Sequence, residues 1–176
     1  MILIAALGTD RVIGSGDGMP WNVPDEYAHF LDLIAGQTVL MGRRSWEIFG
    51  KDLTSAHNIV ISRSARAFPG AEVAGSLEAA IRRGRELGKI LFCAGGAGIY
   101  AQALPHAAAM HLSHIKGVFA GDAYFPAFDD KDWVVERRID HPGFEFVVYR
   151  RVASDLSYCR GCRDGPSRPG TGENNA

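Results

Sequence analysis

Short apolar runs alternate with amphipathic segments along most of the chain, and this alternation restricts its fold more than any other feature. The runs have the length of strands, and the segments between them have helical periodicity over about ten residues. Strands connected through helices imply crossovers, which predict a mainly parallel sheet covered on both faces. The predicted strands span residues 2–7, 38–41, 58–62, 72–74, 89–93, 110–116, 133–139 and 144–151, and the predicted helices span 24–35, 43–49, 77–87 and 98–104.

The end of the chain departs from this alternation. No helix separates the last two runs, and the His-Pro-Gly turn at 141–143 predicts an antiparallel hairpin at one edge of the sheet. The expected fold is a single α/β domain over residues 1–153, with a central sheet of about eight strands and four flanking helices. Residues 154–176 are rich in Gly, Pro, Ser and charge, so we expect a disordered tail.

Composition narrows the class of protein. The chain has 176 residues, of which 47% are hydrophobic, and a formal net charge of −1, as in an ordinary soluble domain. This charge gives no general attraction to nucleic acid or to an anionic membrane. The apolar N-terminus is too short for a signal peptide or a membrane span, and no other run reaches membrane length.

The cysteines indicate a reducing compartment. Three cysteines in a chain of this length do not make a disulfide framework, so we expect the cytosol. Cys159 and Cys162 have the spacing of a redox pair or of two zinc ligands. No second Cys/His pair completes a set of four zinc ligands, and no metal is expected.

Residues 8–23 contain four glycines and Pro20, and no regular element is expected there. A loop of this length in a compact domain is often a lid or a binding loop. Met19, Trp21 and Val23 favour this interpretation over a solvated connector, because a connector has no need of so much apolar surface.

The helix predicted over 24–35 carries a carboxylate on its apolar side. Glu26 has helical spacing to Phe30 and Leu33, which belong to the apolar stripe. A carboxylate buried there must be paired, neutralised or used, and burial raises its pKa unless a ligand donates hydrogen bonds to it. A glutamate that caps the helix start explains the residue equally well, so both interpretations stay open. The polar face is expected to contain Asp25, His29 and Asp32.

Glycines and arginines follow three of the predicted strands. AGGAG (94–98) precedes a helix and offers backbone N–H groups to a phosphate, although alone it indicates only a tight turn. GRRS (42–45) and SRS (62–64) follow two other strands. Ligands of open α/β sheets bind at the carboxyl ends of strands, so we expect the three arginines to converge on the 2′-phosphate of a dinucleotide. The usual Rossmann fingerprint is absent after the first strand.

These segments together resemble the dihydrofolate reductase family. GMPWNVP (18–24), followed by Glu26 and Phe30, is similar to that family's lid-and-helix signature, which is highly specific. The resemblance continues in order from residue 1 to about residue 151. The other matching segments are VLMGRRSW (39–46), NIVISR (58–63), AGGAGIY (94–100), HLSHI (111–115), Gly121-Asp122 and Phe125-Pro126.

The resemblance implies the NADPH-dependent reduction of 7,8-dihydrofolate to tetrahydrofolate, with hydride transfer to pterin C6 and protonation at N5. Glu26 would hydrogen-bond the 2-amino group and the N3 side of the pterin, and Ser113 would support it through its hydroxyl and an ordered water. Trp21 would hold a water near the pterin, and Met19 would close over the nicotinamide. A buried carboxylate would favour the protonated dihydropterin, and water admitted past the lid would supply the proton.

The resemblance also implies two sets of binding residues. For Phe30, Phe49 and Leu53, simple core packing explains the residue type equally well. Asp122 resembles the residue whose loop holds the lid. The substrate would contact Ile4, Ala5, Tyr27, Phe30, Phe49, Leu53 and Ala94. The cofactor NADPH would contact Ala6, Ile13, Gly42, Arg43, Arg44, Ser45, Ser62, Arg63, Ser64, Gly95, Gly96, Ala97, Gly98, Ile99 and Tyr100.

Four positions depart from the family pattern. Ala94 and Tyr27 stand where bulkier or aliphatic residues are usual, and Gly98 stands where several members have a basic or polar side chain. Ala56 stands where the family normally carries an arginine for the α-carboxylate of the folate glutamate. We therefore expect weak dependence on the glutamate tail.

Two other functions stay open. The chain could be a reductase of the same fold acting on a pterin-like substrate without the glutamate, or a non-catalytic module that binds a pterin or a nucleotide. A reductase like that of riboflavin synthesis shares the architecture, but Trp21 and Glu26 argue against it. We expect a cytoplasmic monomer whose partner is a small-molecule substrate, a dihydropterin or dihydrofolate, with no nucleic-acid, membrane or metal partner.

Overall fold

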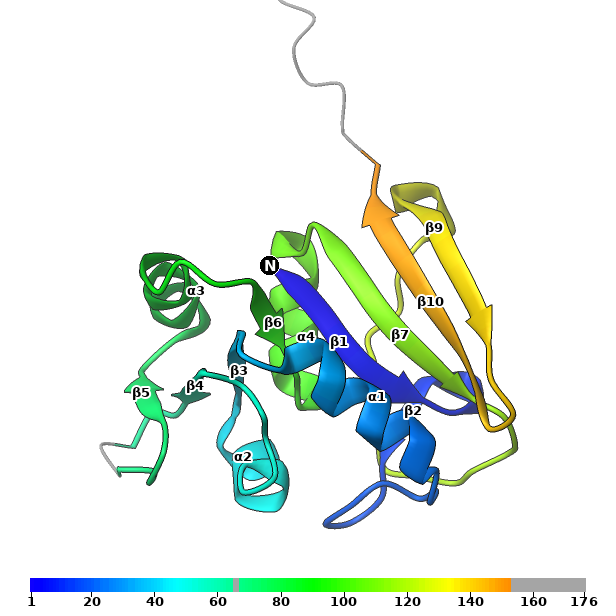
Figure 1. Ribbon diagram of the computed structural model, residues 1–176, viewed down its shortest axis with the longest axis horizontal. Coiled ribbons are helices and arrows are strands. Elements are labelled where there is room, and N and C mark those ends of the chain that lie inside the picture. Colours follow the sequence, from blue (N-terminus) through cyan, green and yellow to red (C-terminus); the bar gives the residue numbers. More distant parts are fainter. Residues whose placement is uncertain (65–66, 153–176) are drawn as a thin grey trace, which may run out of the picture.

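The computed structural model describes residues 1–64 and 67–152, which form a central sheet of eight strands in the order β5-β4-β3-β6-β1-β7-β10-β9 (Figure 1). A separate sheet of two strands pairs β2 (Val12–Gly14) with β8 (Ala123–Tyr124). The strands of the central sheet are β1 (Ile2–Leu7), β3 (Thr38–Gly42), β4 (His57–Ile61), β5 (Glu72–Ala74), β6 (Leu91–Cys93), β7 (Ala109–Ile115), β9 (Trp133–Asp140) and β10 (Phe144–Arg151). The α-helices are α1 (Pro24–Ile34), α2 (Arg43–Phe49), α3 (Leu77–Glu86) and α4 (Ala97–Ala103), and the short 3₁₀ helices are η1 (Thr9–Arg11), η2 (Leu104–His106) and η3 (Asp130–Asp132).

The directions of the strands confirm the predicted fold class. All pairings from β5 across to β7 are parallel, and β10 pairs antiparallel with both β7 and β9. The backbone N–H of His141 donates to the carbonyl of Phe144 at 2.8 Å, which closes the turn between β9 and β10. The strands at one edge are therefore joined by a hairpin, and those in the middle by helical crossovers.

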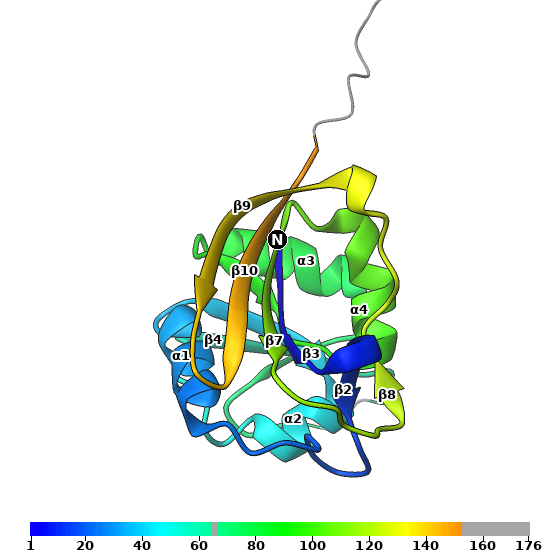
Figure 2. The same ribbon diagram turned by 90° about the vertical axis from the view of Figure 1, so that its right-hand side faces the viewer.

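Helices cover both faces of the sheet, as Figure 2 shows from the side. On one face, Ile34 of α1 and Trp46 of α2 pack with Ile4 and Val39 of the sheet. On the other face, α3 and α4 pack against a cluster that includes Leu3. Because neighbouring side chains of a strand point to opposite faces, β1 must be apolar throughout to serve both clusters, and its central residues are buried.

Local signals explain where the helices begin and end. Pro24 occupies the first turn of α1, and Gly36, at a φ of 68°, lets the chain turn away after it. In α3, the Ser76 hydroxyl accepts a hydrogen bond from the N–H of Ala79 at 3.2 Å, and Gly88 follows the helix at a φ of 67°. The predicted bounds of α1, α2, α3 and α4 lie within one residue of the observed ones.

The prediction that residues 8–23 contain no regular element was wrong. This segment contains η1 and the strand β2, which pairs with β8 through Val12 and Tyr124. The hydrogen-bonding partner of β2 lies far along the chain, and Val12 is buried at 3% exposure. Long-range pairing and burial therefore overcome the local preference of a glycine-rich segment for irregular structure.

His29 does not lie on a solvated face of α1, contrary to the prediction. Its ring centroid lies 4.5 Å from that of Phe146, in an edge-on contact with β10. His141 lies beside it at 5.8 Å, and His111 of β7 contacts the other side of Phe146 at 5.8 Å. Each of these histidines has one ring nitrogen that is buried without a hydrogen-bond partner among the described residues. Contacts with the aromatic side chain of Phe146 on β10 thus place the histidine rings in an apolar layer, which helical spacing alone did not predict.

The sequence also led to expectations about membrane spans, the cysteines and the C-terminal segment. No helix among residues 1–64 and 67–152 is long and apolar enough to cross a membrane. Cys93 lies buried in β6 as a free thiol, and burial raises its pKa to about 12. The expected tail at 154–176, including Cys159 and Cys162, lies outside the described residues.

The histidine packing predicts acid destabilisation. Burial lowers the pKa values of His29, His111 and His114 from the ordinary value of 6.5. Below that pH the unfolded chain takes up protons that the folded chain does not, so the stabilisation is complete above pH 6.5 and is lost as the pH falls. Each histidine contributes at most about 1.4 kcal/mol per pH unit to this slope. Urea unfolding between pH 5 and 7.5 measures it.

A matched pair of variants identifies the source of the slope. His111→Phe should reduce it, because its aromatic neighbours Phe92 and Phe146 accommodate a phenyl ring. His106→Gln, at an exposed position, should leave it unchanged. Equal slopes in the two variants would contradict the assignment to the buried histidines.

Candidate active site

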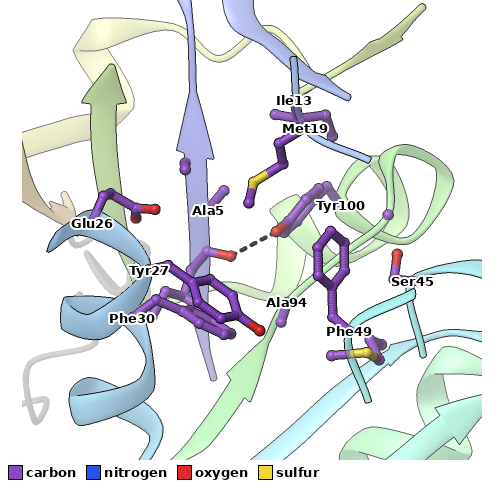
Figure 3. A pocket seen from close by; sticks show the side chains of 14 residues that line it. Ala5, Ile13, Met19, Glu26, Tyr27, Phe30, Ser45, Phe49, Ala94 and Tyr100 are labelled. Carbon is purple, nitrogen blue, oxygen red and sulfur yellow. Dashed lines mark hydrogen bonds between the residues drawn. The ribbon is translucent and has the colours of Figure 1, made fainter. Parts of the chain in front are cut away.

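The carboxyl ends of the central parallel strands meet at one edge of the sheet. There, the backbone N–H of Gly42 donates to the carbonyl of Gly95 at 2.6 Å, which joins the segments that follow β3 and β6. α2 and α4 begin beside this contact, and the first turn of α1 lies across the same edge (Figure 3). Open α/β sheets bind ligands at such an edge.

Glu26 projects from the first turn of α1 toward the sheet and is 5% exposed. Burial raises the pKa of its carboxyl, and a hydrogen bond from the Ser113 hydroxyl on β7 partly opposes that rise. No side chain caps the helix at Val23. The structure therefore places Glu26 on the core side of the helix, paired with a neutral donor.

A narrow inner cavity of about 110 Å³ lies between Glu26 and the start of α2 (Figure 3). Tyr27 and Phe30 form one wall, with stacked rings 5.9 Å apart. Tyr100 forms part of the opposite wall and is held by a 2.6 Å hydrogen bond from its hydroxyl to the carbonyl of Ile4. The lining residues are Ile4, Ala5, Ala6, Ile13, Met19, Glu26, Tyr27, Phe30, Met41, Ser45, Phe49, Ala94, Gly96 and Tyr100.

Two further cavities adjoin the inner cavity. The groove, of about 460 Å³, shares Ile13, Ser45, Phe49 and Gly96 with it. The outer cavity, of about 390 Å³, shares Met19, Glu26, Tyr27 and Phe49 with it. The groove is also lined by Gly14, Gly16, Gly18, Gly42, Arg44, Ile48, Ala97, Gly98, Ile99, Gln102, Asp122 and Ala123, and the outer cavity by Trp21, Asn22, Val23, Pro24, Ile48 and Asp52.

Glycines allow the backbone segments to approach each other closely beside the groove. Gly95 has a φ of 93°, and a Cβ there would lie 2.7 Å from the Tyr100 ring. A Cβ on Gly96 would lie 3.1 Å from the Ser45 hydroxyl, and one on Gly42 would lie 3.1 Å from Ile99. Because neither glycine carries a side chain, the pair leaves its backbone open beside the groove, as a phosphate-binding turn does.

Most residues predicted for the substrate and the chemistry come together in these cavities. Trp21 lines the outer cavity, and its buried indole N–H has no partner among the described residues. Ser113 lies behind Glu26 and does not line a cavity. Leu53 also lies outside the cavities and packs against the cluster that contains Ile34. Ala56 is exposed, and its backbone N–H donates to the Gln37 carbonyl at 2.8 Å.

The predicted basic residues lie in two places. Because β3 and β4 pair with Gly42 opposite Ile61, the exposed Arg43 and Arg63 both follow strand ends that lie side by side. The hydroxyls of Ser62 and Ser64 lie 3.0 Å apart at the same end.

Arg44 has a different environment from the other two arginines. It donates to the carbonyl of Gly16 at 2.8 Å and to the Asp17 carboxylate at 3.0 Å. Asp122 contacts the same loop, because its carboxylate accepts from the N–H of Gly16 at 3.3 Å and its own N–H donates to Gly14 at 3.0 Å. The lid, residues 8–23, is thus held from both sides of the groove.

Several lining residues were missed by reasoning from the sequence. Met41 precedes Gly42 at the strand end, and Ile48 lies three residues after Ser45 on α2, so spacing could have identified both. Gln102 lies one turn after Gly98 on α4, and its side-chain amide donates a hydrogen bond to the carbonyl of Gly98 at 2.9 Å. Asp52 belongs to an irregular turn and had no periodic signal.

Comparison with known proteins places this arrangement in a family. The family model described as dihydrofolate reductase matches residues 1–151. A dihydrofolate reductase of Neisseria meningitidis is 42% identical over 159 residues, which cover 85% of this chain and 96% of that protein. The chain belongs to the dihydrofolate reductase family. The dihydrofolate reductase type A13 of Escherichia coli is 41% identical and covers 76% of this chain and 81% of its own length.

A solved structure shows the same fold. Dihydrofolate reductase from Enterococcus faecalis, complexed with NADP(H) and RAB-propyl, superposes with a TM-score of 0.77 at 21% identity. The match covers 85% of this chain and 95% of that chain. The order of strands and helices described above is therefore that of a dihydrofolate reductase, as the sequence motifs predicted.

Proposed function

We propose that this chain carries out the reaction for which its family is named, the NADPH-dependent reduction of 7,8-dihydrofolate to tetrahydrofolate, with Glu26 as the residue that binds the pterin. The proposal rests on the burial of this carboxylate at one end of the apolar inner cavity. The other end of that cavity opens into the groove, which is bordered by glycines. Two ligands bound in the groove and the inner cavity would meet at Ile13, Ser45, Phe49 and Gly96.

Glu26 is suited to a pterin because the 2-amino group and N3 of that ring are hydrogen-bond donors. A carboxylate in a dry site prefers a partner with donors and positive charge, so Glu26 favours the protonated dihydropterin over the neutral one. Its hydrogen bond with Ser113 keeps the carboxylate oriented toward the ring. The unpartnered N–H of Trp21 is placed to hold a water at the outer cavity, and such water is the source of the proton for N5.

The groove fits a dinucleotide phosphate. Gly95 and Gly96 present backbone beside the groove, where a Cβ on Gly95 would collide with Tyr100 and one on Gly96 would crowd the Ser45 hydroxyl. Arg44 brings a guanidinium to the same groove. Arg43, Arg63, Ser62 and Ser64 extend the polar surface along the neighbouring strand ends and would hold the 2′-phosphate. NADPH, when bound, supplies the hydride, and Tyr100, Ile13 and Met19 provide the apolar walls for its nicotinamide.

The lid completes the site by excluding water. Met19 lies over the inner cavity, and the contacts of Arg44 and Asp122 with residues 14–17 hold the loop in this position. Excluding water strengthens the electrostatic interaction between Glu26 and a protonated pterin. The lid must open to admit both ligands and to supply the proton.

The formal net charge bears on the partners of the protein. A net charge of −1 supports a small-molecule enzyme with no nucleic-acid partner. We also propose that the protein acts as a cytoplasmic monomer. The catalytic domain is expected to extend over residues 1–153, because β10, the last strand of the part that the structure describes, ends at Arg151 and pairs with β7 and β9.

Substitution of Glu26 tests the proposed function. Glu26→Gln should retain the fold and NADPH binding but reduce the rate of dihydrofolate reduction at pH 7 by about 10²–10³-fold, because the amide cannot stabilise a protonated pterin. Loss of NADPH absorbance in single turnovers measures the rate. Asp25→Asn, at an exposed position on the same turn, is the control and should change little. Near-normal turnover by Glu26→Gln would remove Glu26 from the mechanism.

The arginines predict a preference for NADPH over NADH. A charge-assisted hydrogen bond contributes roughly 1.5–3 kcal/mol, so the double variant Arg43→Ala/Arg63→Ala should bind NADPH on the order of a hundredfold more weakly. Binding of NADH, which has no 2′-phosphate, should change little. Fluorescence titration with both dinucleotides measures the two constants, and equal affinities for NADPH and NADH in the native enzyme would refute the assignment.

A further inference from the structure

The charge around the entrance to the substrate site is acidic. The inner and outer cavities are lined, among the described residues, by two charged side chains, Glu26 and Asp52, and both are carboxylates. Glu26 lies deep and is proposed above to bind the pterin ring. Asp52 lies on the exposed side, in the turn that follows α2, where its backbone N–H donates to the carbonyl of Phe49 at 3.2 Å. Any group that extends from the pterin through the outer cavity therefore passes a carboxylate.

Tyr27 forms the other side of this entrance. Its hydroxyl is buried beside the Asp52 carboxylate, which can accept a hydrogen bond from it. Burial raises the pKa of this hydroxyl, and the charge of the Asp52 carboxylate and the hydrogen bond to it raise it further. The phenol stays neutral at physiological pH, so the charge of the entrance comes from Asp52. A neutral hydroxyl and a carboxylate together suit a ligand group with N–H donors or positive charge.

The segment after Asp52 adds no cation to this surface. It continues through Leu53, Thr54, Ser55 and Ala56, all uncharged. The Thr54 hydroxyl donates to the carbonyl of Leu31 at 2.5 Å, which docks this segment on the C-terminal half of α1. Lys51 is exposed and lines neither cavity.

Dihydrofolate brings two carboxylates to such an entrance. Its pterin is the group with donors for Glu26, and its glutamate lies at the other end of the molecule, beyond the aminobenzoyl ring. When the pterin occupies the inner cavity, the glutamate carboxylates are directed outward, past Tyr27 and Asp52. Like charges at a partly exposed site repel each other with an effect on binding of about two- to fivefold at low salt.

We propose that Asp52 makes this enzyme indifferent or averse to the glutamate tail, so that it takes dihydropterins with a neutral or cationic extension at least as well as dihydrofolate. The proposal rests on the proposed function, because it assumes that the pterin lies against Glu26. Asp52 acts here as a specificity-determining residue, and the hydride transfer itself does not depend on it.

Three substrates that share the dihydropterin and the aminobenzoyl amide, and differ in the charge of the group beyond it, test this proposal. They are dihydrofolate, the methylamide of dihydropteroate, which keeps the aminobenzoyl amide but has no carboxylate, and the corresponding 2-aminoethylamide, which is a cation. The native enzyme should show kcat/KM values that rise in this order, with about a threefold step between successive substrates at low salt. In 0.5 M salt the differences should shrink, because exposed charges are screened.

Neutralising the entrance should reverse the trend selectively. Asp52→Asn should raise kcat/KM for dihydrofolate about threefold, lower it for the cationic amide by a similar factor, and leave the neutral amide unchanged. Asp52→Lys should favour dihydrofolate further. Asp32 is an exposed carboxylate on α1 that lines neither cavity. Asp32→Asn is therefore the matched control and should leave all three values unchanged.

The results distinguish a failure of the role of Asp52 from a failure of the proposed reductase function. A native kcat/KM at low salt that is higher for dihydrofolate than for the neutral amide, or equal effects of Asp52→Asn on all three substrates, would overturn the role of Asp52. If none of the three is reduced with NADPH, the proposed function fails. In that case, calorimetric dissociation constants for the same ligands and variants still decide whether Asp52 selects against the tail.

Discussion

The burial of the Glu26 carboxylate is the constraint on which the rest of the site depends. A lone carboxylate loses hydration when it is buried, and the single neutral donor supplied by Ser113 does not replace what water provided. The fold maintains this unfavourable arrangement because α1 is anchored independently, by Ile34 in the core and by the packing of His29 against Phe146. The favourable free energy of packing α1 against the core thus offsets the cost of burying the Glu26 carboxylate, which stays available to a ligand that can neutralise it.

A second constraint brings the two halves of the site together. The contact between Gly42 and Gly95 ties the ends of β3 and β6. A Cβ at Gly95 would collide with Tyr100, and one at Gly96 would crowd the Ser45 hydroxyl. The close approach leaves a groove that runs directly into the inner cavity. Hydride transfer requires two rings in contact with little water between them. Joining the two cavities at a backbone contact, below a lid held by Arg44 and Asp122, provides that geometry.

Apolar periodicity predicted the fold, and the family resemblance supplied the candidate site residues, most of which line the three cavities. Proline and glycine marked the ends of the first helix, and the apolar runs placed the strands of the central sheet. The features that escaped prediction depend on residues far apart in the chain. The pairing of β2 with β8, the packing of His29 beneath α1 and the contact of Arg44 with Asp17 each join segments whose proximity only the folded sheet establishes. Asp52, in an irregular turn, has no periodicity to reveal its place at the entrance.

Glu26 and the glycine pair are proposed to position two ligands in joined cavities. A crystal structure of the protein with NADP⁺ and folate would show where both ligands bind. We expect the Glu26 carboxylate within hydrogen-bonding distance of the pterin 2-amino group and N3, and the pyrophosphate beside Gly95 and Gly96. The nicotinamide ring should lie where the inner cavity joins the groove. A pterin bound away from Glu26, or a pyrophosphate held elsewhere, would rule out this arrangement.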